Sequence, residues 1–597
     1  MRSMRVVYAL GAAVVGLAAY GTAAQGIVPD APQITEISPP SAQRGTTVNV
    51  TLSGQRMAGT KELLCRYSAF PEFIPPAARG VTAQVAGSGD GQVTAKLTIA
   101  PEAPPGLHDI RAATAQGITA PFYFYVSQHK QVPEKEPNTA LSRANRVELP
   151  CTLAGTIDGN EDQDTFAFDA KGGDTLVFEV EGFKRFAPPQ NQQQGISYLD
   201  SFLLLRDASG NEVASDDDSS RLDALLTHRI SASGTYYVTL RDTLYRGRGD
   251  FHYRLSIGKQ PVLTGIFPPG GPQGRKVMAT LFGFNLDSMG ATSIKRMIEL
   301  PAPGVQEYRV TTAEGISNAV PVTAGTMEEN SEVEPNERVQ DATQVSIPVV
   351  CSGMFDKVDD FDGFRFQGQA GQRLLFHITA SRFSSLADTY LTLKTRSGKM
   401  IGQDDDGGGM PDARLDVTLP DTDEYVVFIR NQTRTGCGPR YFYRLAIRPM
   451  QPRFSVVYRR AGVDREGRPA QVAVDSVPVP QGGADEFEVM INRAEGQDRD
   501  VSLSLNLPPN VQGLSIEQIV RTKIDAKNPS NGPENMREST VPQPVIKSGQ
   551  NTASIRIKAG PELAPGTYMN LYLKASGTAG AQPYVVNQPL WLTVVPR

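Results

Sequence analysis

The sequence predicts an all-β protein built from tandem β-sandwiches, in an A-B-A-B order with one further sandwich at the C-terminal end. Three observations lead to this prediction. Two different segments each occur twice, in alternation along the chain. Short runs of alternating apolar and polar residues, typical of half-buried strands, recur throughout. The 56 Gly and 44 Pro residues are frequent enough to end many short strands in turns.

Residues 1–24 predict a secretory signal peptide. Arg2 and Arg5 precede a 15-residue apolar run, Val6 to Tyr20, and the small residues 22–24 offer a cleavage site. The run is short for a transmembrane helix, which needs about 20 apolar residues; an uncleaved anchor is the alternative. We therefore expect a secreted protein (extracellular, at the cell surface or periplasmic) with no membrane span after cleavage.

The A unit opens the repeat. Residues 32–54 recur without a gap at 261–283, and Gly45 is matched by Gly274. The closing pieces match at an offset of 198 residues instead of 229, so the second copy is 31 residues shorter in its middle and has room for fewer strands. We expect the two A units over residues 32–126 and 259–326.

A B unit follows each A unit. Residues 134–138, with the pattern E-x-E-P-N, recur at 332–336, and residues 155–168 recur at 353–366. Both matches keep one offset, which indicates a single duplicated module. We expect the two B units over residues 127–258 and 327–449.

The remaining region, residues 452–597, matches neither repeat. It still alternates in strand fashion, for example at 501–505 and 590–594, so we expect a C-terminal β-sandwich there. Residues 521–543 form a long polar loop that we expect to be disordered. Weak helical spacing occurs at residues 515–527.

Both repeated units resemble known modules. The A units resemble the immunoglobulin-like IPT/TIG domain in their P-x-I-T-x-I-x-P-P opening, paired glycines and late P-G…T…G motif. The B units resemble the bacterial pre-peptidase C-terminal (PPC) domain, a jelly-roll-like β-sandwich attached to many secreted hydrolases. That resemblance rests on E-x-E-P-N, G-x-I-x-G-x-x-D-x-D-x-F-x-F, D-D-D and the late Y-R-L. The C-terminal region resembles only a generic Ig-like sandwich.

The acidic residues of the B units suggest a calcium site. Glu134, Glu136 and Asn138 alternate along an extended segment, so their side chains point the same way. Asp162 and Asp164 repeat this spacing at the start of a predicted strand. Ca²⁺ takes six to eight oxygen ligands, which two such segments together could supply.

The PPC resemblance implies the ligand set, because related modules of secreted collagenases bind calcium with this arrangement. The implied ligands of the first copy are Glu134, Glu136, Asn138, Asp162 and Asp164. Those of the second copy are Glu332, Glu334, Asn336, Asp360 and Asp362. Glu161 could replace Asp162, and Asp359 could replace Asp360. The alternative is that the E-x-E-P-N segment is a solvated linker and the aspartate loop an ordinary turn.

Two further acidic segments, Asp216–Asp218 and Asp404–Asp406, repeat between the B units. Asp favours turns, so we expect hairpin tips there. A second ion stays open as an alternative.

The four cysteines do not match between the copies. Export permits disulfides, and Cys351 with Cys437 is the best candidate pair because both lie in one B unit. Free buried thiols are the alternative.

Catalysis finds little support in the sequence. It contains no H-E-x-x-H or G-x-S-x-G motif, and none of its five histidines is matched by a histidine in the other copy. The net charge of −5 and the absence of a basic run argue against nucleic-acid binding.

We therefore expect a non-catalytic, calcium-binding modular protein for extracytoplasmic binding, adhesion or scaffolding. Its partner would be an extracellular protein or a polysaccharide. The alternatives are an accessory or targeting subunit of a secreted hydrolase, and a hydrolase with an unrecognised catalytic domain.

Overall fold

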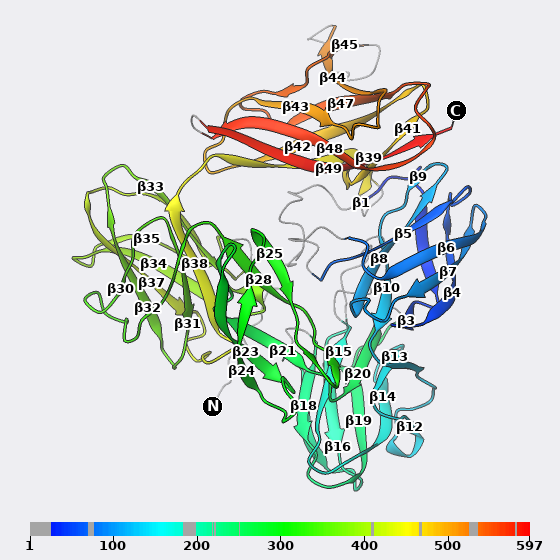
Figure 1. Ribbon diagram of the computed structural model, residues 1–597, viewed down its shortest axis with the longest axis vertical. Coiled ribbons are helices and arrows are strands. Elements are labelled where there is room, and N and C mark those ends of the chain that lie inside the picture. Colours follow the sequence, from blue (N-terminus) through cyan, green and yellow to red (C-terminus); the bar gives the residue numbers. More distant parts are fainter. Residues whose placement is uncertain are drawn as a thin grey trace.

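The chain folds into five successive pairs of β-sheets (Figure 1). The computed structural model describes residues 26–69, 77–182, 199–217, 219, 223–249, 251–407, 411–464, 468–524, 535–579 and 582–596. In these ranges there is no α-helix, and the only helical turns are the 3₁₀ segments η1 (Leu141–Arg143) and η2 (Ser381–Phe383). The predicted all-β, tandem-sandwich fold is thus confirmed. The predicted signal peptide lies outside the described residues, and no helix inside them is long and apolar enough to cross a membrane.

The first sandwich joins a sheet in the order β2-β4-β7-β6 to a sheet in the order β3-β10-β8-β5, with β9 paired to β8. Every second residue of β7 is buried, so its alternating sequence turns one face toward the shared core. The strands are β2 (Gln33–Ser38), β3 (Ser41–Gln43), β4 (Thr47–Gln55), β5 (Glu62–Tyr67), β6 (Val81–Ser88), β7 (Gln92–Ile99), β8 (Gly106–Thr114), β9 (Gly117–Ile118) and β10 (Phe122–Ser127).

The third sandwich repeats this plan in a reduced form. Its sheets run β21-β23-β24 and β22-β28-β25, beside a small β26-β27 pair. Counterparts of β5 and β6 are missing among its described residues, which accounts for the shorter second copy. The strands are β21 (Val262–Phe267), β22 (Gly270–Pro272), β23 (Lys276–Phe284), β24 (Ser293–Glu299), β25 (Gly304–Tyr308), β26 (Thr311–Thr312), β27 (Gly315–Ile316) and β28 (Val320–Gly325).

The glycines shared by the two A units have backbone roles. Gly45 and Gly274 both have positive φ, 77° and 72°, which glycine adopts without a Cβ penalty. A Cβ on Gly54 would lie 2.0 Å from the Gln33 carbonyl oxygen, and Gly283 is as tightly placed. Both lie opposite a register shift between the first two long strands of their unit, so glycine permits the close approach of the two backbones there.

The second and fourth sandwiches share one topology. Their sheets run β11-β13-β20-β15-β18 with β12-β14-β19-β16-β17, and β29-β31-β38-β33-β36 with β30-β32-β37-β34-β35. The second contains β11 (Lys130–Pro133), β12 (Asn145–Arg146), β13 (Cys151–Thr156), β14 (Gln163–Ala170), β15 (Thr175–Glu181), β16 (Ser201–Arg206), β17 (Glu212–Asp216), β18 (Leu225–Arg229), β19 (Gly234–Asp242) and β20 (His252–Gly258). The fourth contains β29 (Glu328–Ser331), β30 (Thr343–Gln344), β31 (Val349–Met354), β32 (Phe361–Gly368), β33 (Arg373–Thr379), β34 (Thr389–Thr395), β35 (Met400–Asp404), β36 (Arg414–Thr418), β37 (Asp423–Asn431) and β38 (Phe442–Pro449).

All four cysteines are free, so the predicted Cys351–Cys437 disulfide is wrong. Cys351 lies on β31 and is fully buried in the core of the fourth sandwich. Cys437 is half-buried in the loop between β37 and β38. The two thiols belong to different layers of the module, the core and the loop surface, which explains why the shared domain did not bring them together.

The fifth sandwich has sheets in the orders β1-β39-β42-β47-β44-β45, with β40 paired to β39, and β41-β49-β48-β43-β46. Its strands are β1 (Gly26–Ile27), β39 (Arg453–Asp464), β40 (Pro469–Val474), β41 (Ser476–Pro480), β42 (Ala484–Ala494), β43 (Val501–Asn506), β44 (Leu514–Lys523), β45 (Met536–Val541), β46 (Val545–Ile546), β47 (Thr552–Ala559), β48 (Gly566–Ala579) and β49 (Gln582–Val595).

Two expectations for this region are corrected. Residues 515–523 belong to strand β44 instead of a helix, because the strand pairs on both sides with β45 and β47. The loop predicted over residues 521–543 is shorter than expected, because Arg521 and Glu538 are paired residues of the β44–β45 hairpin. Only residues 525–534 of that loop lie outside the described residues.

The first and fifth sandwiches lie side by side, so the first and last domains of the described chain are in contact (Figure 1). Strand β1 pairs with β39. Trp591 of β49 packs with Leu64 and Ile118 of the first sandwich. Its ring lies 4.7 Å from the Arg66 guanidinium carbon and 4.6 Å from that of Arg111, the geometry of cation–π contacts.

Candidate metal centres

The structure brings Glu134, Glu136 and Asp164 together in the second sandwich. One carboxylate oxygen of each lies within 4.8 Å of the other two. Calcium–oxygen bonds are 2.3–2.6 Å long, so oxygens at this spacing fit around one calcium ion. The segment that carries the two glutamates directly follows β11, and Asp164 is the second residue of β14. The glutamate segment is thus anchored to its own module instead of forming a free linker.

Glu134 is fixed by its neighbours. Its carboxylate accepts hydrogen bonds from the Thr156 backbone N–H (2.8 Å) and from the Tyr253 hydroxyl (2.9 Å). A Cβ on Gly155 would lie 2.0 Å from a carboxylate oxygen of Glu134. The repeated glycine of the sequence motif therefore makes room for this carboxylate, a role that the sequence did not reveal.

The fourth sandwich repeats the arrangement with Glu332, Glu334 and Asp362. Glu332 accepts hydrogen bonds from the Met354 backbone N–H (2.7 Å) and the Tyr443 hydroxyl (3.5 Å). The duplicated modules thus place matched carboxylates in matched positions.

Buried, unpartnered polar atoms point to a missing ligand in both modules. Asp164 and Asp362 are 0% exposed, and neither oxygen of either carboxylate has a partner in normal hydrogen-bond geometry. Asn138 is also 0% exposed, and neither its side-chain oxygen nor its nitrogen has a partner. Buried polar atoms are satisfied in most proteins, because leaving one unsatisfied costs about 1–3 kcal/mol. A cation among these oxygens would remove that cost.

The crowding of carboxylates shifts their titration. Burial and the adjacent Glu134 raise the pKa of Asp164 to about 10. Burial raises the pKa of Glu332 to about 8 and that of Asp362 well above its usual range. In the absence of a cation these shifts favour the protonated form of each group. The donor set therefore fits a hard divalent ion such as calcium, which favours carboxylate oxygens.

The remaining predicted ligands fall into two groups. Asp162 lies beside the cluster of the second sandwich, with its carboxylate bound to the Asp158 backbone N–H (2.9 Å). Asp360 joins Glu334 and Asp356 in a second cluster of the fourth sandwich. Asp356 was not among the predicted ligands, although an aspartate is present at this position in both copies.

Asn336 lies at 0% exposure, and its side-chain oxygen accepts the Gly363 N–H at 3.2 Å. The alternatives Glu161 and Asp359 lie outside these clusters. Both have positive φ, and Asp359 pairs with Arg434 at 3.6 Å.

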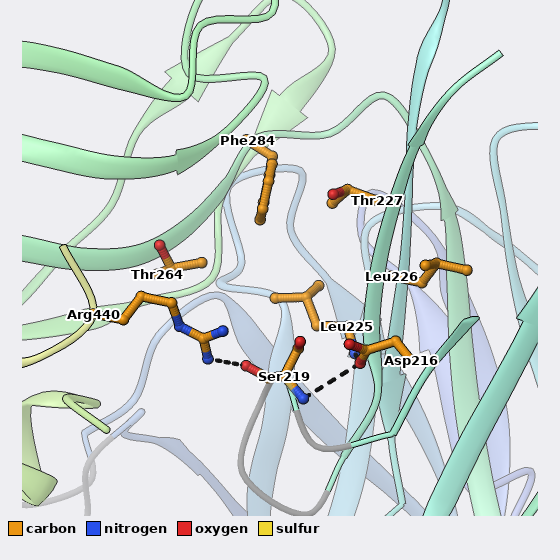
Figure 2. A pocket seen from close by; sticks show the side chains of 8 residues that line it. All are labelled: Asp216, Ser219, Leu225, Leu226, Thr227, Thr264, Phe284 and Arg440. Carbon is orange, nitrogen blue, oxygen red and sulfur yellow. Dashed lines mark hydrogen bonds between the residues drawn. The ribbon is translucent and has the colours of Figure 1, made fainter. Parts of the chain in front are cut away.

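The predicted hairpin tips at the triple-Asp segments are wrong, because β17 and β18, like β35 and β36, belong to opposite sheets and each segment begins the crossing from one sheet to the other. Asp216 accepts the Leu225 backbone N–H at 2.7 Å, and Asp404 accepts the Arg414 N–H at the same distance. Figure 2 shows Asp216 beside a cavity of about 200 Å³ between the second, third and fourth sandwiches. Arg440 enters it and donates a hydrogen bond to the Ser219 carbonyl. This hydrogen bond links the loop of the second sandwich to the fourth sandwich. Among the described residues, no acidic cluster of metal-binding geometry lies at this loop.

The histidines have structural surroundings. His108 is fully buried, with its Nε2 2.9 Å from the Pro104 carbonyl oxygen. Burial lowers the pKa of His108 and His377 to about 4, so both are neutral at pH 7. His228, His252 and His377 lie on strands β18, β20 and β33.

One stretch of the chain is similar to part of a known peptidase. No family model matches the chain. A probable subtilase-type serine protease of Deinococcus radiodurans is 31% identical over 119 residues, which are 19% of this chain and 15% of that relative. The matched stretch therefore spans a small part of the relative's length.

The solved structures that match include two related to peptidases, both at low similarity. The pre-peptidase C-terminal domain of a collagenase from Bacillus anthracis is 19% identical, with 21% of this chain and 99% of that chain covered and a TM-score of 0.15. The secreted serine protease VesC from Vibrio cholerae is 10% identical, with 62% and 64% covered and a TM-score of 0.14. The similar proteins named here are thus peptidases or a domain of one, and the IPT/TIG-like resemblance of the A units stays a prediction.

Proposed function

We propose that this chain is a non-catalytic, calcium-binding modular protein that works outside the cytoplasm in binding, adhesion or scaffolding. Its two PPC-like modules would each hold a calcium ion, between Glu134, Glu136 and Asp164 and between Glu332, Glu334 and Asp362. The observation that carries the proposal is the buried aspartate of each cluster, whose carboxylate oxygens lack partners. The ion would neutralise adjacent carboxylates, and the chain's own residues would hold it at one end of each module.

Calcium is expected to raise the melting temperature of the chain that lacks residues 1–24. A ligand at 100 times its Kd stabilises the folded state by about 2.7 kcal/mol per site. Melting curves in calcium and in chelator measure this, with magnesium as the matched control ion because it demands smaller octahedral geometry. Identical melting curves in calcium and in chelator would mean that the acidic clusters bind no calcium.

Calcium binding is also expected to release protons at pH 7. Without the ion, the pKa of Asp164 is raised to about 10 by burial and Glu134, and burial raises that of Glu332 to about 8. Carboxyl groups must lose these protons to bind a cation, so affinity should rise from pH 6 to pH 8. Calorimetric titrations in two buffers of different ionisation enthalpy measure the release. Equal heats in both buffers would contradict it.

A second candidate, an accessory or targeting subunit of a secreted protease, is favoured by the stretch of 31% identity to a subtilase-type serine protease. Immobilised chain incubated with the source organism's culture medium tests it. A peptidase retained in calcium and released by chelator would support this candidate. Retention of non-peptidase surface proteins or polysaccharide would favour adhesion or scaffolding instead.

A further inference from the structure

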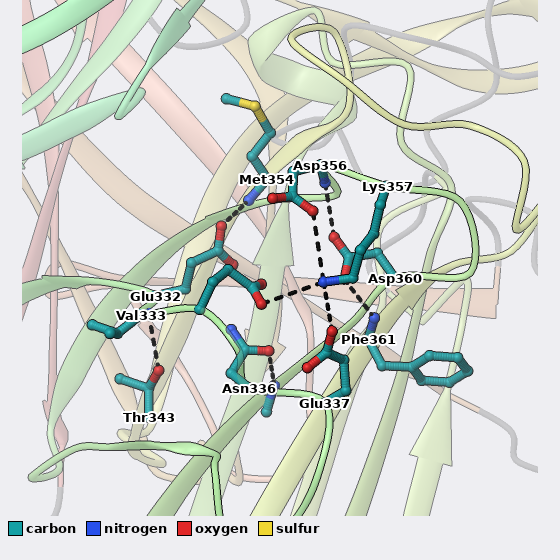
Figure 3. A network of polar contacts seen from close by, with 12 residues as sticks. Glu332, Val333, Asn336, Glu337, Thr343, Met354, Asp356, Lys357, Asp360 and Phe361 are labelled. Carbon is teal, nitrogen blue, oxygen red and sulfur yellow. Dashed lines mark hydrogen bonds and ion pairs between the residues drawn. The ribbon is translucent and has the colours of Figure 1, made fainter.

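The acidic sites of the second and fourth sandwiches differ in one basic side chain, Lys357. In the fourth sandwich the Lys357 ammonium nitrogen lies 2.5 Å from a Glu337 oxygen and 3.4 Å from oxygens of both Glu334 and Asp360. It also lies 3.8 Å from an Asp356 oxygen. Figure 3 shows this nitrogen at the centre of the polar network, at the end of a side chain that leaves the loop after β31.

The second sandwich has no such cation. The position of Lys357 is held by Gly159, and the position of Glu337 is held by Thr139. No ion pair within 4.0 Å joins Glu136, Asp158 or Asp162 to a basic residue in the described part of the chain. The lysine and its nearest glutamate partner are thus present together in the fourth sandwich and absent together from the second.

Lys357 bears on the calcium site through a shared carboxylate. Glu334 belongs both to the cluster with Glu332 and buried Asp362 and to the cluster with Asp356 and Asp360. An ammonium group bound to Glu334 competes with an ion for that ligand, and it also repels the ion.

We propose that Lys357 is a tethered cation in the outer part of the acidic site of the fourth sandwich. It lowers the calcium affinity of this site and makes the fourth sandwich less dependent on calcium than the second sandwich. This inference rests on the proposed calcium sites. The ion pair with Glu337 raises the pKa of Lys357, so the group stays charged at all physiological pH values. The second sandwich would then depend on calcium, whereas the carboxylates of the fourth sandwich would be partly neutralised by its own lysine.

Lys357→Gln tests the inference in a chain that also carries Asp164→Asn, so that only the fourth sandwich binds calcium. Removal of one charge near the ion should tighten the Kd for calcium about fivefold, measured by calorimetry. In chelator the same variant should lower the melting temperature of the fourth sandwich, because the outer carboxylates lose their cation. Lys399→Gln, an exposed lysine of the same module, is the control with the same charge change and should alter neither value.

The reciprocal variant is Gly159→Lys in a chain that carries Asp362→Asn. A Cβ on Gly159 meets no atom within 4 Å, and its φ is not positive, so a lysine fits without strain. The calcium affinity of the second sandwich should fall about fivefold. Gly234→Lys, equally open and in the same module, is the control.

The outcomes separate the two proposals. If the chain without these variants binds no calcium, the proposed function fails and this inference fails with it. If calcium binds but Lys357→Gln and Gly159→Lys leave both affinities unchanged, only the tethered cation is overturned. If each variant shifts its own module in the stated direction, the inference holds.

Discussion

Asp164→Asn should lower the melting temperature of the second sandwich in calcium and leave it unchanged or raised in chelator. In calcium the variant loses a carboxylate ligand and with it about 2.7 kcal/mol at 100 times the Kd. For a module of this size that corresponds to ~10 °C. In chelator it replaces a buried carboxyl group, whose oxygens make no hydrogen bond of normal geometry, by an uncharged amide of similar size.

Asp169→Asn is the matched control for this prediction. Asp169 lies on the same strand, β14, and its side chain is 65% exposed in a surface ion pair with Arg146. Exposed ion pairs contribute little to stability, so the effect of this substitution on the melting temperature should be small and equal in both conditions. A loss of the same size in calcium and in chelator for Asp164→Asn would show that the residue is structural and holds no ion.

Trp591→Ala should separate the first and fifth sandwiches. Trp591 is 9% exposed, packs on Leu64 and Ile118, and has two guanidinium groups within 4.7 Å of its ring centre. Truncation of a buried tryptophan costs about 3–5 kcal/mol. The ion pair between Arg111 and Asp475 (2.5 Å) then remains as a polar contact that water can replace.

Small-angle X-ray scattering measures the separation as an increase in the radius of gyration. Tyr572→Ala on the neighbouring strand β48, whose side chain is partly exposed, is the control and should leave the radius unchanged. A radius equal to that of the parent chain for Trp591→Ala would mean that β1 and the polar contacts alone hold the two sandwiches together.

Local patterns in the sequence account for most of the fold. Alternation predicts strands such as β7 and β43 because one face of each is buried. The repeats predict the shared sheet order of the second and fourth sandwiches, since the spacing between matched strands is preserved. The β44–β45 hairpin escaped prediction because its exposed polar residues carry no burial pattern, and its strands are defined by pairing with distant β47.

The candidate site was predictable to the extent that spacing controls it. Glu134, Glu136 and Asp164 converge because each lies at a strand end with a repeated partner. The roles of Gly155, Tyr253 and Lys357 were not predictable, since they depend on which distant strands are neighbours and on a difference between the two copies. The contact of Trp591 with the first sandwich is hidden for the same reason.

A crystal structure of the chain grown in calcium tests the central claim most directly. The account predicts an ion at 2.3–2.6 Å from carboxylate oxygens of Glu134, Glu136 and Asp164, and a second ion in the matched cluster of the fourth sandwich. A direct hydrogen bond between the carboxyl groups of Glu134 and Asp164, with no ion between them at saturating calcium, would contradict it.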